Sequence, residues 1–288
     1  MGAIYKKELR GYFTSVTGYI VIAAMTLFIG IYFTAYNLNY GYPSFAYALS
    51  SVALIIIIAV PLLTMRCLSE ERKSKTDQLL LTAPVSVLDI VAAKWLSMMT
   101  VILVPMLVCC TCPLILLTTG QGTPLIDYST IFCFYCMCGV YVAIGEWISS
   151  LTENQIVAAI LTFVALLVLY LWDSLIGFIP ATAMASYVGL LILTAIVCIV
   201  VQAFTKNALV TVILGFVGVA ASTVAYLVMG DKMANLVPNA LGSFSMMEPL
   251  ENFAYYSVFD LRGIVLYLSL AALFLFLTMQ SVQKRRWS

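Results

Sequence analysis

Long runs of apolar residues alternate with short polar segments along most of the chain. A membrane-spanning helix needs about 20 mostly apolar residues, and eight runs reach that length. They cover residues 16–38, 45–65, 90–117, 128–149, 156–179, 183–204, 208–229 and 263–282. We therefore expect an all-α, polytopic helical membrane protein with about eight transmembrane helices, built as one domain over residues 1–288.

Composition and hydropathy exclude an ordinary soluble protein. Hydrophobic residues make up 63% of the chain, charged residues only 9%, and the mean hydropathy is +1.06, whereas soluble domains are about 25% charged. A nucleic-acid binder, a disordered chain and a secreted disulfide scaffold are therefore excluded. The sequence contains no His, which removes His-based catalysis and the usual metal sites.

The basic residues orient the expected helices. With a cytoplasmic N-terminus and eight alternating spans, twelve of the 14 Lys and Arg residues lie on the cytoplasmic side, as the positive-inside rule requires. Lys232 and Arg262 lie outside, and both chain termini are cytoplasmic. A six-span arrangement, with residues 183–229 as a buried or re-entrant hairpin, keeps the same orientation and stays open.

Residues 1–15 have the pattern of an amphipathic helix lying along the inner membrane surface. Helical spacing gathers apolar side chains on one face and leaves the basic side chains off it. The segment is either a positive flank that orients the first span or an elbow helix that connects this span to a cytoplasmic partner. The elbow candidates are Tyr5, Lys6, Lys7, Leu9, Arg10 and Phe13.

Residues 66–89 form the main cytoplasmic connection, which is charged in its first half and apolar in its second. Ser69 is placed to cap a short helix with acidic residues in its first turn, and Pro84 ends that helix. The sequence leaves open a plain charged connection and a helix that binds a partner through its three leucines. The partner-binding candidates are Glu70, Glu71, Arg72, Lys73, Lys75, Thr76, Asp77, Gln78, Leu79, Leu80, Leu81, Thr82 and Pro84.

Polar residues also gather between the fourth and fifth spans. Glu146 lies near the cytoplasmic end of its span, beside Trp147, so we expect it to be exposed at the membrane interface rather than buried for function. Thr152 and Gln155 form a capping box at the start of the fifth span. The candidates for a gate or substrate pathway are Glu146, Asn154 and Gln155.

The external connection 231–262 mixes acidic and aromatic residues with apolar ones. Such a segment either dips into the outer leaflet as short re-entrant helices or forms an exposed loop.

Signatures of catalysis are missing from the sequence. It contains no GxxxxGK[ST] phosphate loop, no HExxH and no GxSxG. All Cys but Cys67 lie in apolar runs, and the clusters at 109–112 and 133–138 have no neighbouring His or acidic residue, so we expect them to pack as small hydrophobes without a metal. The chain is expected not to be an enzyme and to hold no cofactor itself.

Four segments, in chain order, resemble the type-2 ATP-binding-cassette (ABC) transporter permeases of the bacterial gliding-motility and multidrug-export kind. They are IYKKELRGYFTS at 4–15, SEERKSKTDQLLLTAPVS at 69–86, SSLTENQIVAAILTF at 149–163 and ENFAYYSVFDLRGIVLYLSLAALFLFLT at 251–278. The first resembles the elbow helix of these permeases and the second resembles their coupling helix. The chain departs from the typical six spans in the middle, where residues 183–229 add a pair.

The resemblance implies the transmembrane subunit of an exporter in the bacterial cytoplasmic membrane. Such a subunit pairs with a second permease, identical or related, and engages a separate ABC ATPase that holds ATP and Mg. The helix in residues 70–84 would be the coupling helix. Two other classes stay open: a membrane anchor or scaffold that recruits a cytoplasmic partner, and a non-ABC carrier, which the scarcity of intramembrane charge disfavours. The low charge of the spans suggests hydrophobic or amphipathic cargo.

Overall fold

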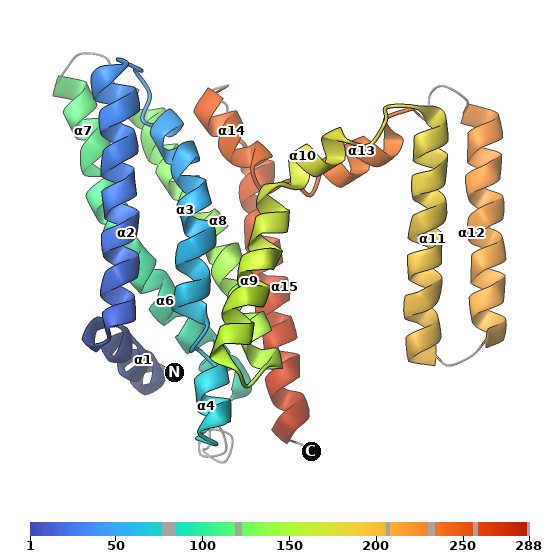
Figure 1. Cartoon of the computed structure of the whole chain (residues 1–288), viewed down its shortest axis with the longest axis horizontal. Helices are drawn as coiled ribbons and strands as arrows, with labels where there is room; N and C mark the ends of the chain where they lie inside the picture. Colours follow the sequence, from blue (N-terminus) through green and yellow to red (C-terminus); the bar gives the residue numbers. More distant parts are fainter. Residues whose placement is uncertain (77–84, 119–122, 206–207, 230–233, 256–258, 287–288) are drawn as a thin grey trace. The chain divides into compact units, whose positions relative to one another are not determined.

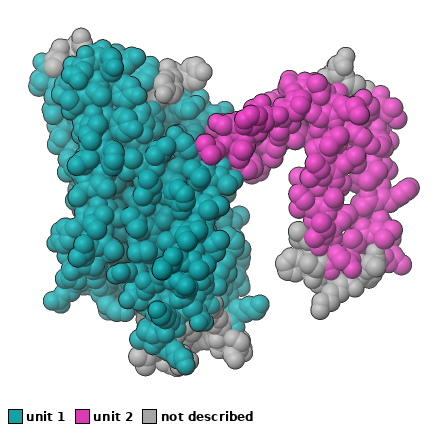
Figure 2. All heavy atoms as spheres, viewed as in Figure 1, with its two compact units in different colours: residues 1–170, 246–288 teal, residues 171–245 magenta. Residues whose placement is uncertain are grey.

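The computed structural model of the chain describes residues 1–76, 85–118, 123–205, 208–229, 234–255 and 259–286. The regular secondary structure of these residues is helical throughout. They form two compact units, residues 1–170 with 246–288 (unit 1) and residues 171–245 (unit 2), which Figure 2 colours separately. A single permease domain remains a prediction of the sequence.

Unit 1 is a helical bundle (Figure 1). Its helices are α1 (Gly2–Thr14), α2 (Val16–Tyr32), the π-helix η1 (Phe33–Asn39), α3 (Ala46–Thr64), α4 (Ser69–Lys73), α6 (Val87–Cys109), α7 (Thr111–Thr118), α8 (Pro124–Leu151), α9 (Gln155–Tyr170), α14 (Glu248–Tyr255) and α15 (Leu261–Arg286).

Helices α3 and α8 form the centre of unit 1, and both are apolar on nearly every side. A helix that is apolar all round belongs inside a protein core or in a membrane, and these two lie mostly inside the bundle. Helices α2 and α9 pack against α3, while α6, α9, α14 and α15 pack against α8. Gly145 lets the two central helices approach closely, because a Cβ at this position would lie only 2.8 Å from the Thr64 methyl group.

Within unit 1, the described segments that the sequence assigns to the cytoplasm lie together at one end. Figure 1 shows α1, α4 and the C-terminal end of α15 at this end of the bundle, with α7 and α14 at the other. This arrangement agrees with the orientation derived from the basic residues. We name it the cytoplasmic end after that expected orientation.

A buried carboxylate fastens the opposite end of the bundle. Asp127, in the first turn of α8, accepts hydrogen bonds from the Ser44 hydroxyl and the Phe45 backbone N–H, both at 2.9 Å. The Asn37 side-chain amide donates to the carbonyl oxygens of Tyr42 and Ser44, again at 2.9 Å. These bonds give hydrogen-bond partners to backbone N–H and carbonyl groups between η1 and α3. Buried backbone polar groups need such partners wherever water is scarce.

Every predicted span overlaps a helix in the described residues. Five segments are long and apolar enough to cross a membrane: Val16–Asn39, Ala46–Lys73, Val87–Thr118, Pro124–Leu151 and Leu261–Lys284. The predicted fifth span was too long, because the helix stops at Tyr170 and the short α10 begins at Trp172. The other three predicted spans correspond to shorter apolar helices in the described part of the chain: Gln155–Tyr170, Ala183–Ile199 and Thr211–Val224. The polytopic helical class is therefore confirmed.

Unit 2 contains α10 (Trp172–Gly177), α11 (Ala183–Thr205), α12 (Ala208–Met229) and α13 (Leu236–Gly242). Helices α11 and α12 pair as a hairpin, and α10 packs on α13, where the Trp172 indole N–H donates to the Leu241 carbonyl oxygen at 2.9 Å. Large apolar side chains such as Ile192 and Phe216 stay exposed on the hairpin. Such a surface suits a lipid environment rather than water.

The external connection is not simply an exposed loop. Within unit 1, α14 buries Leu250 and Phe253 completely, and it packs against α3 and α8. The Tyr267 hydroxyl of α15 donates to the Met246 carbonyl oxygen at 2.5 Å, just before this helix begins. The exposed-loop alternative is therefore wrong for residues 246–253, where a short helix belongs to the core.

Candidate functional site

The first helix is fastened to the cytoplasmic end of the bundle. Its apolar positions Tyr5, Leu9 and Phe13 are half-buried, whereas its basic side chains are exposed. The Tyr5 hydroxyl shares a 2.9 Å hydrogen bond with the Thr100 hydroxyl of α6. This amphipathic helix therefore lies on the other helices and presents its basic face outward. The exposed basic residues are Lys6, Lys7 and Arg10.

A tight turn joins α1 to α2. Ser15 adopts an extended conformation and donates its backbone N–H to the Gly11 carbonyl oxygen at 3.0 Å. The turn brings Gly18 against the backbone of Tyr12, so closely that a Cβ would lie 3.0 Å from the Tyr12 carbonyl carbon and still nearer its oxygen. The Tyr12 hydroxyl donates to the Leu63 carbonyl oxygen at 3.3 Å. Desolvation raises the pKa of Tyr12, which keeps this donor protonated.

The start of α4 is capped by a side chain from another helix. The Ser149 hydroxyl oxygen, near the end of α8, accepts the backbone N–H groups of Leu68 and Ser69, both at 3.2 Å. The prediction that Ser69 caps this helix is therefore wrong: its hydroxyl donates back to the Met65 carbonyl oxygen. The first N–H groups of a helix lack intrahelical acceptors, so Ser149 ties the charged segment directly to the bundle.

A buried ammonium group joins three separate segments at this end. Lys94 of α6 is only 1% exposed, and its Nζ lies 2.9 Å from a Glu71 carboxylate oxygen of α4 and 3.2 Å from a Glu8 carboxylate oxygen of α1. It also donates to the Cys67 carbonyl oxygen at 2.9 Å. An ammonium group has three donors, and each has an acceptor here. We call Glu8, Glu71 and Lys94 the charge junction.

The exposed Lys7 completes the charge balance at the edge of the junction. Its ammonium group lies 3.6 Å from Glu8 and 3.7 Å from Glu71, while its side chain is 66% exposed. A pair in this environment contributes little free energy. Breaking a buried pair is far more costly, because it leaves an uncompensated charge inside the protein. Lys94 therefore ties both α1 and α4 to α6 through its buried ion pairs.

A hollow opens beside the junction between α1 and the chain that leads into α4. Its volume is about 260 Å³, and Glu8, Tyr12, Arg66, Cys67 and Glu70 contribute to its wall. Its lining is mixed polar and apolar. Within the described residues, no group of three His, Cys, Asp or Glu side chains is arranged to hold a metal ion.

The partner-binding candidates fall into two groups. Glu71 faces Lys94, and the Arg72 guanidinium donates to the Ser150 carbonyl oxygen of α8, so these two hold α4 in place. The remaining described candidates are exposed, namely Glu70, Lys73, Lys75 and Thr76. Seven candidates lie outside the described residues: Asp77, Gln78, Leu79, Leu80, Leu81, Thr82 and Pro84.

The structure separates the three gate or pathway candidates. Glu146 is completely buried, and neither of its carboxylate oxygens has a hydrogen-bond partner among the described residues. The expectation that it is exposed at the interface is therefore wrong, because the helices packed around α8 exclude it from the surface. Asn154 is exposed, and its side-chain oxygen accepts the Ile156 N–H at 3.0 Å. Asn154 therefore caps α9, where the sequence predicted Thr152. Gln155 is half-buried.

Sequence reasoning missed Glu8, Lys94 and Ser149. Lys94 carried a usable signal, since an ionisable residue within an apolar helix is expensive and is generally paired inside the bundle. Its partners had no such signal. Glu8 lies 86 residues away and Ser149 lies 80 residues from Ser69, so only the tertiary fold brings them together.

Comparison with known proteins identifies a family over nearly the whole chain. Residues 3–279 match the family described as ABC-2 family transporter protein. A search of the curated proteins gives no match.

Proposed function

The chain belongs to the ABC-2 transporter family, and we propose that it is the membrane-spanning subunit of an exporter driven by a separate cytoplasmic ATPase. Its membership of this family and its long apolar helices make the chain a multi-pass membrane component of an ABC-type transporter. In the proposed assembly, ATP and Mg bind to the ATPase subunit. Two permease subunits, identical or related, pair in the bacterial cytoplasmic membrane and form the substrate pathway.

The charge junction carries the proposed coupling. One face of α4 is held by Ser149, Lys94 and the carbonyl oxygen of Ser150, while Glu70 and Lys73 stay exposed on the other. A cytoplasmic subunit that binds the exposed face would move α4 together with α6, α8 and α1. Packed helices shift as bodies rather than deform continuously, so a push on α4 reaches the membrane helices α6 and α8 directly.

The first test is to identify what binds the protein in its own membrane. The full chain is extracted with an affinity tag in mild detergent, and co-purifying proteins are identified by mass spectrometry. A stoichiometric ABC ATPase is expected, and its absence in several detergents with the chain still folded would contradict the proposal. Reconstitution separates an exporter from a simple anchor, because only the exporter hydrolyses ATP in response to cargo.

Charge reversal on the exposed side of α4 tests where the ATPase binds. The double variant Lys73→Glu with Lys75→Glu is expected to lower ATPase retention about tenfold. Reversing charges that pair across an interface replaces attraction with repulsion and weakens association. Retention is measured from the ratio of ATPase to permease after affinity purification. Thermal stability should not change, since both side chains are exposed.

Arg262→Glu provides the matched control at the other end of the bundle. Arg262 is also exposed, but it lies at the start of α15, on the external side in the proposed orientation. Its reversal should leave ATPase retention unchanged. Equal losses for both variants, or none for the α4 variant, would place the ATPase contact elsewhere.

A further inference from the structure

A buried carboxyl group without a hydrogen-bond partner lies beside the charge junction. Glu146 of α8 is 0% exposed, and neither of its oxygens has a partner among the described residues. It precedes Ser149 by one helical turn, so both side chains lie on the face of α8 that meets the start of α4. The Lys94 ammonium and the Glu8 carboxylate are near enough to act on Glu146 electrostatically. An ionisable group inside a membrane protein is costly and calls for a functional explanation.

The charge junction has no hydrogen-bond donor to spare for Glu146. The three N–H donors of Lys94 go to the two carboxylates of the junction and to the Cys67 carbonyl oxygen. With the exposed Lys7 beside it, the junction contains two positive and two negative charges. An ionised Glu146 would add a buried negative charge that has neither a counter-charge nor a hydrogen bond, which is strongly unfavourable.

Other polar groups at this end of α8 have partners of their own. The Arg72 guanidinium of α4 donates to the Ser150 carbonyl oxygen. The Tyr12 hydroxyl of α1 donates to the Leu63 carbonyl oxygen. Desolvation raises the pKa of Tyr12, and the nearby Glu146 adds to the rise. Tyr12 and the buried Cys67 also line the hollow beside α1, so they separate Glu146 from its space.

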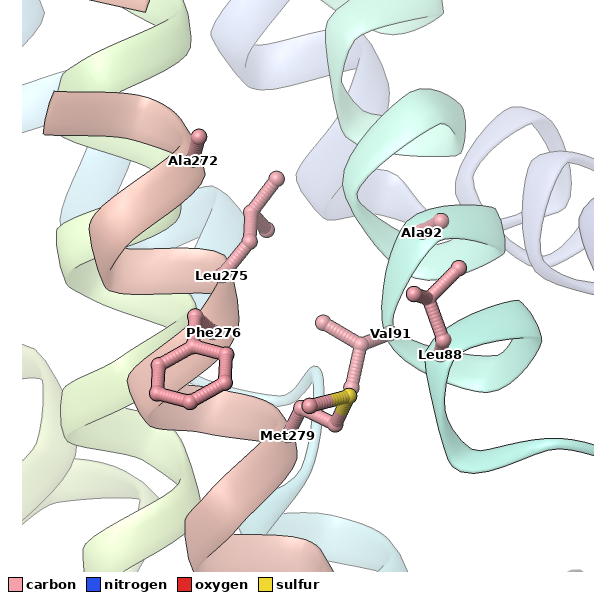
Figure 3. A pocket seen from close by; sticks show the side chains of 7 residues that line it. All are labelled: Leu88, Val91, Ala92, Ala272, Leu275, Phe276 and Met279. Atoms are coloured by element: carbon pink, nitrogen blue, oxygen red, sulfur yellow. The ribbon is translucent and has the colours of Figure 1, made fainter. Parts of the chain in front are cut away.

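Among the described residues, the other helices packed on α8 bring no counter-charge to Glu146. Helices α3, α7 and α9 contain no charged residue. The side chains that α6 and α15 turn toward each other are apolar, as Figure 3 shows for Val91, Leu275 and Met279. Lys284 of α15 is exposed, and the acidic residues of α14 lie at the opposite end of the bundle. Lys94 is thus the one described cation that acts on Glu146.

We propose that Glu146 is a proton-binding site, protonated while Lys94 holds α4 and ionised when α4 moves away. The neutral acid suits a buried position without a counter-charge. When Glu71 leaves with α4, Lys94 loses a carboxylate that Glu146 replaces. The O–H bond of the acid then breaks, water entering from the hollow accepts the proton, and the carboxylate pairs with Lys94. The movement of α4 rests on the proposed function, whereas the protonated carboxyl is a property of the isolated chain.

Infrared spectroscopy of the purified full-length chain tests the proton directly. A protonated carboxyl group has a C=O stretching band that is separate from the bands of carboxylates. Subtracting the Glu146→Gln spectrum from the wild-type spectrum at neutral pH should leave this band, because the amide keeps the side-chain shape without a titratable proton. Glu153→Gln is the matched control at an exposed position and should retain the band. A difference spectrum without the band would overturn the proposal.

Glu71→Gln imitates the loss of the α4 carboxylate from the junction. Lys94 then lacks one negative partner, so Glu146 should ionise and most of its protonated-carboxyl band should disappear. Glu70→Gln removes the adjacent, exposed carboxylate and should leave the band unchanged. An unchanged band in a folded Glu71→Gln chain would overturn the link between Glu146 and α4. Because no ATPase is present, neither result depends on the exporter assignment.

The pH dependence of stability provides a second measurement on the unmodified chain. Unfolding exposes Glu146 to water, where a glutamate ionises above about pH 4.3, so unfolding releases its proton. The equilibrium constant for unfolding should therefore rise about tenfold for each pH unit between about pH 5.5 and 7. The chain has no His, so no side chain with an ordinary pKa changes charge in this window. Stability that does not fall as the pH rises, or that falls equally in Glu146→Gln, would contradict the proposal.

Discussion

Replacing Lys94 with methionine is expected to lower the free energy of unfolding by about 3–5 kcal/mol, the usual cost of removing one member of a buried ion pair. The Lys94 side chain is 1% exposed, and those of Glu8 and Glu71 are only 15% and 14% exposed. Without the Lys94 ammonium group, two largely buried carboxylates face each other, and the only cation left beside them among the described residues is the exposed Lys7. Unfolding of the detergent-purified chain, followed by circular dichroism during titration with denaturing detergent, measures the change.

Two further variants show whether the effect belongs to the charge junction. Lys7→Met removes a cation from the same two carboxylates, but its side chain is 66% exposed, so a loss of at most about 1 kcal/mol is expected. Adding Glu8→Gln and Glu71→Gln to Lys94→Met removes the uncompensated charges and should restore much of the stability. A Lys94→Met chain that unfolds like the wild type, or no recovery in the triple variant, would contradict the junction.

Gly18→Ala is expected to separate α1 from α2. The free energy of unfolding should fall by about 3 kcal/mol, at the upper end of the usual range for overpacking. The added methyl group would press on the Tyr12 backbone carbonyl, and a backbone atom cannot rotate away as a side chain can. Relief requires α1 to move, which pulls Glu8 away from Lys94. The variant should therefore lose stability and, in the proposed assembly, retain less ATPase. Both quantities come from the measurements described above.

Gly30→Ala is the matched control on the same helix. No atom lies within 4 Å of a Cβ built at Gly30. An alanine in a helix interior is favoured over glycine by roughly 0.5–1 kcal/mol, so this variant should be as stable as the wild type or slightly more stable. Equal destabilisation by both substitutions would mean that the close approach of Gly18 to Tyr12 does not hold the elbow.

The apolar runs by themselves determined where the helices of this protein lie. In a bilayer each backbone polar group must find its partner within the protein, and a helix satisfies that need locally. Residues 45–65 and 128–149 could therefore be assigned from composition and length alone, and they correspond to α3 and α8. The distribution of basic residues likewise predicted that α1, α4 and the C-terminal end lie together, because that rule also operates on local sequence.

Only the tertiary structure decided which polar residues matter at the cytoplasmic end. Position along the chain suggested that Glu146 is exposed and that Ser69 caps α4, yet Glu146 is covered by neighbouring helices and Ser149 of α8 supplies the cap. Lys94 selects Glu8 and Glu71 from segments far apart in sequence. Burial and pairing depend on which helices pack together, and no local pattern of apolar and polar residues specifies the side-chain contacts between distant helices.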